Sequence, residues 1–285
     1  MMSVEMSDFF DKIRATLPQT EEDWQKLHVN LFNEMQENKN NYSYWYPKVK
    51  DCGIKIVESH VYKLDFEAFD LIGDLYELRC SVPTDEFYQS NLYKKWQDKI
   101  KLMIKDLKPK TYNIKTGTFS NKFNFESCIS SKNEIPSKVL DLLIKDFEYE
   151  ANGYSEFVVR DIIESEPNVF TIYNGLPLNF EIRVFYDFDK HKIMYSHNYW
   201  DFDYCKSNMT PSDRAILELE SSRFNYLYNR YHQTVENLVD KYMNNINLEG
   251  QWSIDLMYNQ ATNKYYLIDM AIAQQSAYYN GYVSD

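Results

Sequence analysis

The sequence has little glycine, proline or cysteine, and it has no long apolar run. Its 285 residues include 7 glycines, 8 prolines and 4 cysteines. The scarcity of glycine and proline indicates regular helices and strands joined by few special turns. No segment approaches the ~20 apolar residues that a membrane-spanning helix needs. The N-terminal stretch is acidic and amphipathic, unlike a signal peptide, so we expect a soluble, cytoplasmic protein.

The cysteines and histidines argue against two classes of site. Cys52, Cys80, Cys128 and Cys205 lie far apart and form no CxxC or Cys/His ligand pattern, so we expect reduced thiols and no zinc. The five histidines are scattered along the chain. No Ser-His-Asp or Cys-His arrangement therefore suggests a covalent nucleophile.

The sequence also lacks an excess of positive charge. Its 31 Lys and Arg residues against 43 Asp and Glu residues give a net charge of −12. This balance argues against a general nucleic-acid binder or a protein of anionic membranes. The run "YKKWQDKIKLMIKDLKPK" leaves a local nucleic-acid contact open, although it is also typical of the solvated face of an amphipathic helix.

The residues that are abundant predict a globular α+β chain. Hydrophobic residues make up 44% and charged residues 26%, with 25 tyrosines, 17 phenylalanines and 5 tryptophans. Helical and strand-like patterns predict mainly antiparallel sheets. A long helix is expected from the N-cap Thr210 to about Asn244. We expect an N-terminal α/β region that selects substrate or partner (1–108), followed by two α+β lobes (109–165 and 166–285).

The stretch "YNIKTGTFSNKFNF" places two lysines at the ends of a polar loop between strand-like runs. Lys115 precedes the loop and Lys122 follows it. Backbone N–H groups in such a loop can cradle phosphate oxygens, and lysine adds a point charge beside them. The Walker pattern is absent, and the loop joins two expected strands and opens no helix. A polar hairpin loop without a ligand is the structural alternative.

The run "NFEIRVFYDF" predicts a strand with one apolar face. Strand alternation puts Phe180, Ile182 and Val184 on that face, and it puts Glu181 and Arg183 together on the other. The arginine either meets solvent at a half-exposed strand or points into a cleft.

Two aspartates stand inside the last pair of expected strands, although aspartate is depleted in strands. Asp255 lies in "WSIDLMY" and Asp269 in "YYLIDMAIA". A hairpin symmetric about Ala261 pairs Tyr258 with Lys264 and makes the aspartates diagonal neighbours, ~7–8 Å apart. They could then hold one divalent ion, whereas a one-residue slip would separate them onto opposite faces. Each aspartate could instead pair with an arginine or a backbone N–H group.

The order of these motifs resembles the ATP-grasp superfamily. The lysine-bearing loop, "VVRDII", "EIRVFYDFDKHKIMY" and "DLMY…YYLIDMA" follow one another as that family's phosphate loop, adenine hinge, arginine hairpin and metal strands do. The resemblance covers about residues 112–273. The branch it is most similar to holds the phage and bacterial clade named for two arginines and a lysine, and the eukaryotic cell-division-cycle assembly chaperone.

The resemblance implies ATP and Mg²⁺ as cofactors, and it assigns roles to individual residues. It implies a fold in which two α+β lobes enclose a nucleotide cleft. Lys115 and Lys122 would contact the phosphates, and Lys115 and Arg183 would be catalytic. The other implied positions are the hinge residues Arg160, Asp161 and Ile162, a ribose contact at Glu164 or Glu166, and the metal ligands Asp255 and Asp269.

One position departs from the family pattern. Most members carry an asparagine two residues after the last acidic ligand, where this chain has Ala271, and Gln274 is a candidate substitute. We expect an ATP-dependent carboxylate–amine ligase acting on a peptide, protein or small carboxylate. An ATP-binding assembly factor without ligation and an ATP-dependent enzyme acting on RNA are the alternatives.

Overall fold

The computed structural model describes residues 20–165, 168–259 and 262–280. The helices are α2 (Glu21–Gln36), α3 (Tyr42–Val49), α4 (Phe66–Ser81), α5 (Thr84–Gln89), α6 (Asn91–Met103), η1 (Lys122–Cys128), α7 (Ile135–Glu148), α8 (Phe202–Cys205), η2 (Lys206–Asn208), α9 (Pro211–Met243) and η3 (Ala273–Gln275). The strands are β1 (Lys55–Ile56), β2 (Ser59–Lys63), β3 (Thr111–Thr116), β4 (Ile129–Ser131), β5 (Glu156–Arg160), β6 (Thr171–Ile172), β7 (Leu176–Pro177), β8 (Phe180–Asp187), β9 (Lys192–Asn198), β10 (Gln251–Asn259) and β11 (Lys264–Ile272). Within these ranges, none of the helices combines the length and apolar character needed to cross a membrane.

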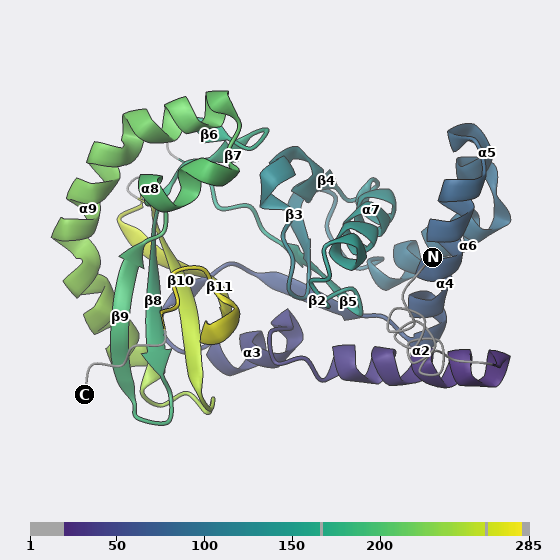
Figure 1. The fold of residues 1–285 in the computed structure, drawn as a ribbon, viewed down its shortest axis with the longest axis horizontal. Helices are drawn as coiled ribbons and strands as arrows, with labels where there is room; N and C mark the ends of the chain where they lie inside the picture. The colour runs from purple at the N-terminus through teal and green to yellow at the C-terminus, as the bar shows by residue number, and fades with distance from the viewer. Residues whose placement is uncertain (1–19, 166–167, 260–261, 281–285) are drawn as a thin grey trace, which may run out of the picture.

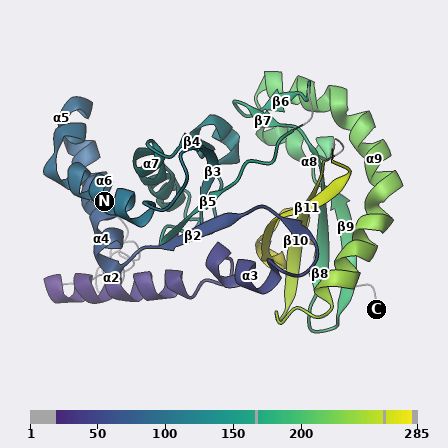
Figure 2. The same ribbon diagram turned by 180° about the vertical axis from the view of Figure 1, so that it is seen from behind.

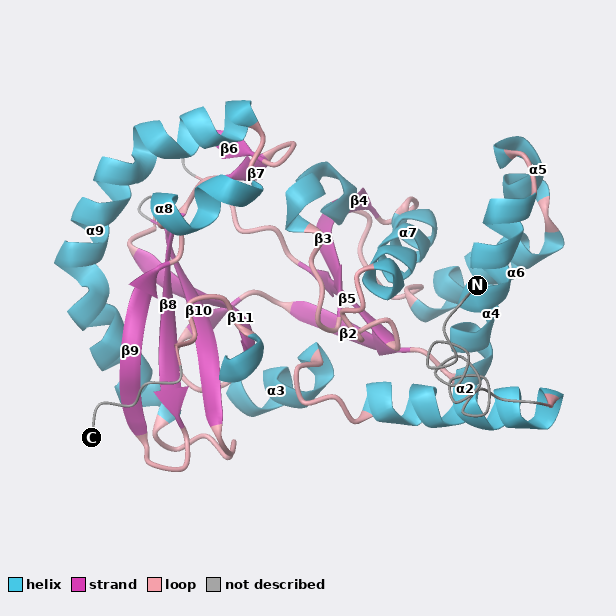
Figure 3. Cartoon of the chain, in the orientation of Figure 1, coloured by secondary structure: helices cyan, strands magenta, loops and turns pink. Residues whose placement is uncertain are grey.

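Two sheets organise the chain into two lobes (Figure 1). A five-stranded sheet has the order β1-β11-β10-β8-β9, and a four-stranded sheet has the order β2-β5-β3-β4. Every pairing in them is antiparallel except the short parallel pair of β1 with β11. Each sheet has its own buried apolar cluster. Figure 3 shows strands of both sheets facing the middle of the molecule, with α9 at one side and α4 to α6 at the other.

Helix α9 covers the outer side of the five-stranded sheet, as Figure 1 shows. Its start follows from sequence, since the Thr210 hydroxyl accepts a hydrogen bond from Asp213 N and Pro211 occupies the first turn. It buries Leu217, Phe224, Val235, Val239 and Met243. Each such side chain contributes about 1.5–3 kcal/mol by leaving water. The predicted helix is thus confirmed, ending one residue before Asn244.

The N-terminal region contributes to both lobes. Strand β1 pairs with β11 of the five-stranded sheet, whereas β2 pairs with β5 of the four-stranded sheet. Tyr42, Trp45 and Val49 of α3 lie in the apolar cluster of the larger sheet. Figure 2 shows the segment from α3 through β2 linking the two lobes. The division into functional regions at residues 108 and 165 stays a prediction.

Two local expectations were wrong. The segment after the polar loop is the 3-10 helix η1 and not a strand, because Asn121 turns the chain with a φ of 41°. The C-terminal hairpin also has another register, with Tyr258 paired to Tyr265 and Asn259 to Lys264. The Asn259 amide oxygen accepts from Thr262 N at 3.0 Å, and Asn263 has a φ of 50°, so the connection is not centred on Ala261.

Candidate functional site

The two strand aspartates face each other directly across β10 and β11. Asp255 pairs with Asp269, whereas the next pair towards the turn is Leu256 with Leu267. Ile268 is therefore an extra residue in β11, a β-bulge. Without it, Asp269 would stand opposite Ile254 and point to the other face of the sheet. The bulge therefore places Asp255 and Asp269 on the same face of the sheet.

The bulge also joins the lobes. Arg160, at the end of β5, donates from Nη1 to the carbonyl oxygen of Ile268 at 2.8 Å. Its Nε donates to Asn113 Oδ1 of β3 at 3.0 Å. A bulged residue leaves the regular ladder of strand hydrogen bonds, which makes its carbonyl available to such a donor. Arg160 therefore fixes the four-stranded sheet against the aspartate pair.

Each aspartate is neutralised by a cation. Arg183 of β8 is paired with Asp255 in the sheet register, and its Nε and Nη2 donate to the two carboxylate oxygens at 2.7 Å each. Lys115 of β3 donates to both oxygens of Asp269, at 3.1 and 2.9 Å, from the other lobe. Burial alone would lower the pKa of Arg183, but the Asp255 carboxylate outweighs it and raises that pKa.

The polar loop after Lys115 is fixed by a buried carboxyl group. Asp146 of α7 accepts from the Thr116 hydroxyl and, at 2.9 Å, from Gly153 N. Burial raises the pKa of Asp146 to about 6. The Thr116 backbone N–H group donates to Phe119 O at 2.9 Å, which closes the loop tightly. Lys115 is thus held by its strand and by a loop with few alternative conformations.

Gly153 is expected to tolerate no side chain. A Cβ atom there would lie 2.1 Å from Thr118 Oγ1 and 2.6 Å from Thr118 N, which belongs to the loop backbone. Gly153→Ala should lower the free energy of unfolding by about 1–3 kcal/mol, measured by urea denaturation. Gly73→Ala in α4 is the matched control, because nothing lies within 4 Å of its Cβ position. Equal destabilisation by both substitutions would contradict this account.

Lys122 enters the site from the first residue of η1. Its ammonium donates to the Tyr199 hydroxyl and lies 4.6 Å from that ring's centroid. Arg183 lies over the same ring at 4.8 Å. Within the described ranges, no carboxylate lies within 4.0 Å of the Lys122 ammonium. Two cations thus share one tyrosine, and in the described residues Lys122 has no carboxylate at salt-bridge distance.

Glu181 lies on the same strand face as Arg183, two residues earlier. It is 8% exposed and lines the cavity beside Asp255. Burial, together with repulsion from the Asp255 carboxylate, raises the pKa of Glu181 to about 8. The group is therefore largely protonated at neutral pH and can donate a hydrogen bond there.

Most of the expected residues meet at two adjoining cavities. Lys122, Arg160, Asp255 and Asp269 line a cavity of about 110 Å³. A second cavity, of about 360 Å³, is lined by Arg160, Asp161, Ile162 and Glu164. The cavities share six lining residues, which are Asn113, Phe125, Arg160, Leu176, Glu181 and Ile268. Together they form one continuous cleft between the lobes.

The residues predicted as the adenine hinge and ribose contact line the second cavity in different ways. The Asp161 carboxylate forms an ion pair with the Lys110 ammonium at 2.6 Å. The backbone N–H group of Asp161 donates to Glu58 O at 3.0 Å. Ile162 is exposed and offers an apolar side chain. The Glu164 carbonyl accepts from Asn259 Nδ2 at 2.7 Å. Glu166 lies outside the described residues.

Side-chain amide groups from other parts of the chain lie near Ala271. A separate cavity, of about 370 Å³, is lined by Asp269, Ala271, Asn40 and Gln275, among others. The Asn40 side chain hydrogen-bonds Gln275 and accepts from Ile272 N at 2.6 Å. Gln275 lines this cavity together with Asp269, whereas the exposed Gln274, the predicted substitute, lines none of the cavities described above. Sequence spacing gives no signal for Asn40, which is more than two hundred residues away.

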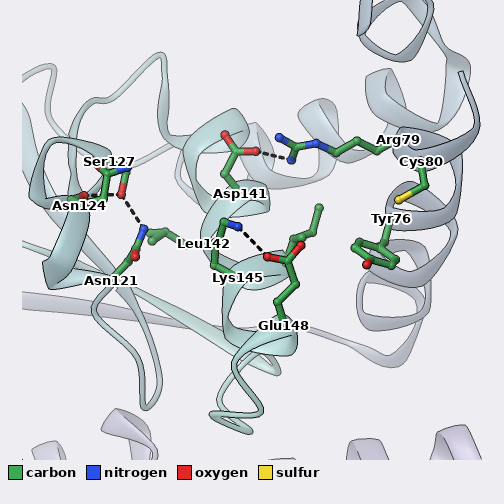
Figure 4. A pocket seen from close by; sticks show the side chains of 11 residues that line it. Tyr76, Arg79, Cys80, Asn121, Asn124, Ser127, Asp141, Leu142, Lys145 and Glu148 are labelled. Atoms are coloured by element: carbon green, nitrogen blue, oxygen red, sulfur yellow. Dashed lines mark hydrogen bonds and ion pairs between the residues drawn. The ribbon is translucent and has the colours of Figure 1, made fainter. Parts of the chain in front are cut away.

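A larger cavity, of about 490 Å³, lies outside this cleft between α4, η1 and α7 (Figure 4). Its cations are already paired, Arg79 with Asp141 at 2.6 Å and Lys145 with Glu148 at 2.6 Å. A phosphate would have to displace these carboxylates. In the interlobe cleft Lys115 and Arg183 are also paired, but Lys122 has no carboxylate within 4.0 Å in the described residues, so the cleft is the better anion site.

Comparisons with known proteins bear on the fold. No family model matches the chain, and no curated protein matches its sequence. The chain is similar to the structure of C-terminally truncated Cdc123 from Schizosaccharomyces pombe, with a TM-score of 0.51, 11% identity, and coverage of 86% of this chain and 88% of that one. The other Cdc123 structure from that organism gives a TM-score of 0.49 at 12% identity, over 86% and 88% of the two chains.

A RimK domain protein ATP-grasp from Sphaerobacter thermophilus matches with a TM-score of 0.35 and 7% identity, over 82% of this chain and 59% of that one. The likeness to truncated Cdc123, at such low identity, concerns the fold alone. With the two mainly antiparallel sheets, it confirms the α+β fold expected from the sequence, and the ATP-grasp assignment stays a prediction.

Proposed function

We propose that the interlobe cleft binds ATP with Mg²⁺ and that the chain is an ATP-dependent carboxylate–amine ligase. The observation that carries this proposal is the convergence of Lys115, Lys122 and Arg160 from one lobe on Asp255 and Asp269 from the other. Transfer of a phosphoryl group requires positioning and charge neutralisation more than a covalent nucleophile. The cleft supplies these cations and carboxylates together.

The two adjoining cavities suit the two ends of a nucleotide. The larger one is lined by apolar side chains, including Ile162, Leu176 and Met257, and by the backbone of the hinge. A flat base fits such a slot, and Glu164 lies at its rim for the ribose. The phosphates would then extend past Arg160 towards Lys122. A single ligand would thereby span both cavities.

The aspartate pair suits Mg²⁺, which proteins often hold through one or two carboxylates together with substrate phosphates. Asp255 and Asp269 stand directly opposite each other, and a carboxylate has about four lone-pair sites. The contacts from Arg183 and Lys115 leave further lone pairs on these oxygens. When bound, Mg²⁺ would neutralise charge on the phosphate oxygens.

In the proposed reaction, an acceptor carboxylate oxygen attacks the γ-phosphorus, and the bond to the bridging oxygen breaks to release ADP. An amine then attacks the acyl carbon of the acyl phosphate and releases inorganic phosphate and a proton. Lys115, Lys122 and Arg183 would stabilise the negative charge on the phosphoryl oxygens.

Nucleotide binding without ligation is a second candidate function. Position 271 is alanine, and a cation already faces each aspartate. These features favour an assembly factor in which the nucleotide shapes a partner surface.

The polynucleotide alternative has less support. In the lysine-rich helix α6, Lys95 pairs with Glu67 at 2.8 Å and Lys99 pairs with Asp65 at 2.9 Å. These carboxylates compete with any phosphate backbone for the same ammonium groups.

Product analysis distinguishes the candidates. The full chain is incubated with ATP, Mg²⁺ and a pool of amino acids and peptides, and the nucleotides are separated. ADP with phosphate, dependent on the pool, supports the ligase. ATP binding without turnover supports the assembly factor, and AMP with pyrophosphate contradicts both.

Glu181 predicts a specific pH dependence of stability. The pKa of its folded-state carboxyl is about 8, against the ordinary 4.5, so the folded protein keeps a proton that the unfolded chain has lost between these values. Its contribution to stability is therefore full below pH 4.5 and is lost as pH rises through 8. Glu181→Gln mimics the protonated group, so it should match wild type below about pH 4.5 and become increasingly more stable than wild type as pH rises towards 8. If the free energy of unfolding differs between Glu181→Gln and wild type by the same amount at every pH, the raised pKa of Glu181 is contradicted.

A further inference from the structure

A third cavity adjoins the phosphate end of the cleft and differs from it in chemistry. Its volume is about 280 Å³, and it shares Lys122, Tyr199 and Trp200 with the cavity beside the aspartates. Arg183 lines it from β8. Small-molecule pockets of proteins hold about 300–1,000 Å³, so this cavity suits a compact group and not a large ligand.

The charges at this cavity are of one sign. Its lining includes the cations Lys122 and Arg183 and no aspartate or glutamate. Both cations lie over the Tyr199 ring, and the ammonium of Lys122 has a neutral phenol as its hydrogen-bond partner. Arg183 is already paired with Asp255, whereas Lys122 has no carboxylate within 4.0 Å in the described residues. A buried charge without a close counter-ion is unfavourable, so a bound anion would relieve the cost at Lys122.

The rest of the cavity is aromatic. Phe123 and Tyr173 meet edge to face at 5.0 Å on one side. Tyr204 and Tyr278 lie against each other at 4.1 Å on another. Rings in such arrangements hold a further ring by edge and offset contacts. The cavity therefore offers a cationic end and an aromatic body.

We propose that this cavity is the acceptor subsite and that it takes a carboxylic acid bearing one aromatic ring. The proposal rests on the proposed function, because it names the acceptor of that reaction. The carboxylate lies between Lys122 and Arg183, beside the phosphate end of the cleft. The ring lies among Phe123, Tyr173 and Tyr204.

In this position the acceptor carboxylate can react with ATP in two steps. One carboxylate oxygen forms a bond to the γ-phosphorus, and the bond between that phosphorus and the bridging oxygen breaks. ADP leaves with the electron pair, and the aryl acid becomes an acyl phosphate. An amine then forms the amide, with release of inorganic phosphate and a proton. Lys122 contacts both cavities and can neutralise the acceptor and the phosphoryl group in turn.

The alternative is that the same rings form an aromatic cage for a cationic ligand. Cages of this kind place a cation over the faces of aromatic side chains. Here Lys122 already lies 4.6 Å from the centroid of Tyr199 and 5.7 Å from that of Trp200. A second cation would add repulsion, so the geometry favours an acid.

Calorimetry with three small probes tests the assignment. Phenylacetate has the ring and the carboxylate, acetate lacks the ring, and phenethylamine reverses the charge. Each is titrated into the full chain, and ATP with Mg²⁺ is titrated separately. Tyr204→Ala removes an exposed ring of the cavity, and Tyr226→Ala on α9 removes an exposed ring outside it.

We expect phenylacetate to bind more tightly than either other probe. Tyr204→Ala should weaken phenylacetate binding about 3–10-fold, because a lost ring contact is worth about 0.5–1.5 kcal/mol. ATP affinity in that variant, and both affinities in Tyr226→Ala, should stay at the wild-type values.

Each other outcome has a defined meaning. Preference for phenethylamine, or ATP binding without phenylacetate binding, overturns the acceptor subsite while leaving the nucleotide site standing. Phenylacetate binding that depends on Tyr204, in a chain that does not bind ATP, supports an aryl-acid site in this cavity but contradicts the proposed function and, with it, the role as acceptor. An equal loss in both tyrosine variants also overturns the subsite.

Discussion

Replacing Lys115 with methionine is expected to lower ATP turnover ~10²–10³-fold, the usual effect of removing one preorganised donor from an active site. The Lys115 side chain is 1% exposed, and its ammonium lies 2.9 Å from an Asp269 oxygen. Methionine keeps much of the buried volume and removes the charge. Asp269, at 37% exposed, can be hydrated in the variant, so the fold should persist. Turnover is measured as acceptor-dependent release of ADP.

The control for this experiment is another lysine. Lys241→Met on α9 removes an exposed ammonium that lies over the Tyr242 ring, outside the cleft. It should leave turnover and circular dichroism unchanged. Wild-type turnover in Lys115→Met, with the same dichroism spectrum, would remove Lys115 from the site.

Asp255→Asn is expected to lower the free energy of unfolding by about 3–5 kcal/mol, because it leaves a buried guanidinium without its counter-ion. The side chains of Arg183 and Asp255 are 11% and 8% exposed, and their contact is bidentate. Urea denaturation measures the change. Asp203→Asn breaks the exposed pair with Lys206, in which Asp203 is 84% exposed, and should cost less than about 1 kcal/mol.

Removing both partners tests whether the cost arises from the unpaired charge. The double variant Arg183→Met/Asp255→Leu should regain most of the stability lost in Asp255→Asn, since an apolar pair of similar volume replaces a buried ion pair at little cost. If the double variant is as unstable as Asp255→Asn, packing and not charge determines the loss.

The sequence predicts the parts of the fold that depend on local signals. Thr20 forms the capping box with Asp23 at the start of α2, and Thr210 caps α9, because both caps need residues three positions apart. Alternation placed Phe180, Ile182 and Val184 of β8 in the core. These features rest on neighbouring residues, so a single sequence contains enough information.

The features that complete the cleft depend on distant contacts. The bulge at Ile268 has no signature in "YYLIDMAIA", yet it decides the face on which Asp269 lies. The carbonyl of Ile268 is used by Arg160, more than a hundred residues earlier. Sequence reasoning also missed Asn113, Glu181 as a protonated group, and Tyr199 between two cations. Long-range pairing, not local propensity, sets these positions.

The most direct test of the shared cleft is calorimetric titration of ATP into the full chain, with and without Mg²⁺. The same titration is made with Lys122→Met and Asp269→Asn, which alter opposite lobes of the cleft. Saturable binding that Mg²⁺ strengthens, and that both variants lose while keeping their circular dichroism, is the predicted result. Wild-type affinity in both variants, or no binding by the wild-type chain, would contradict the account.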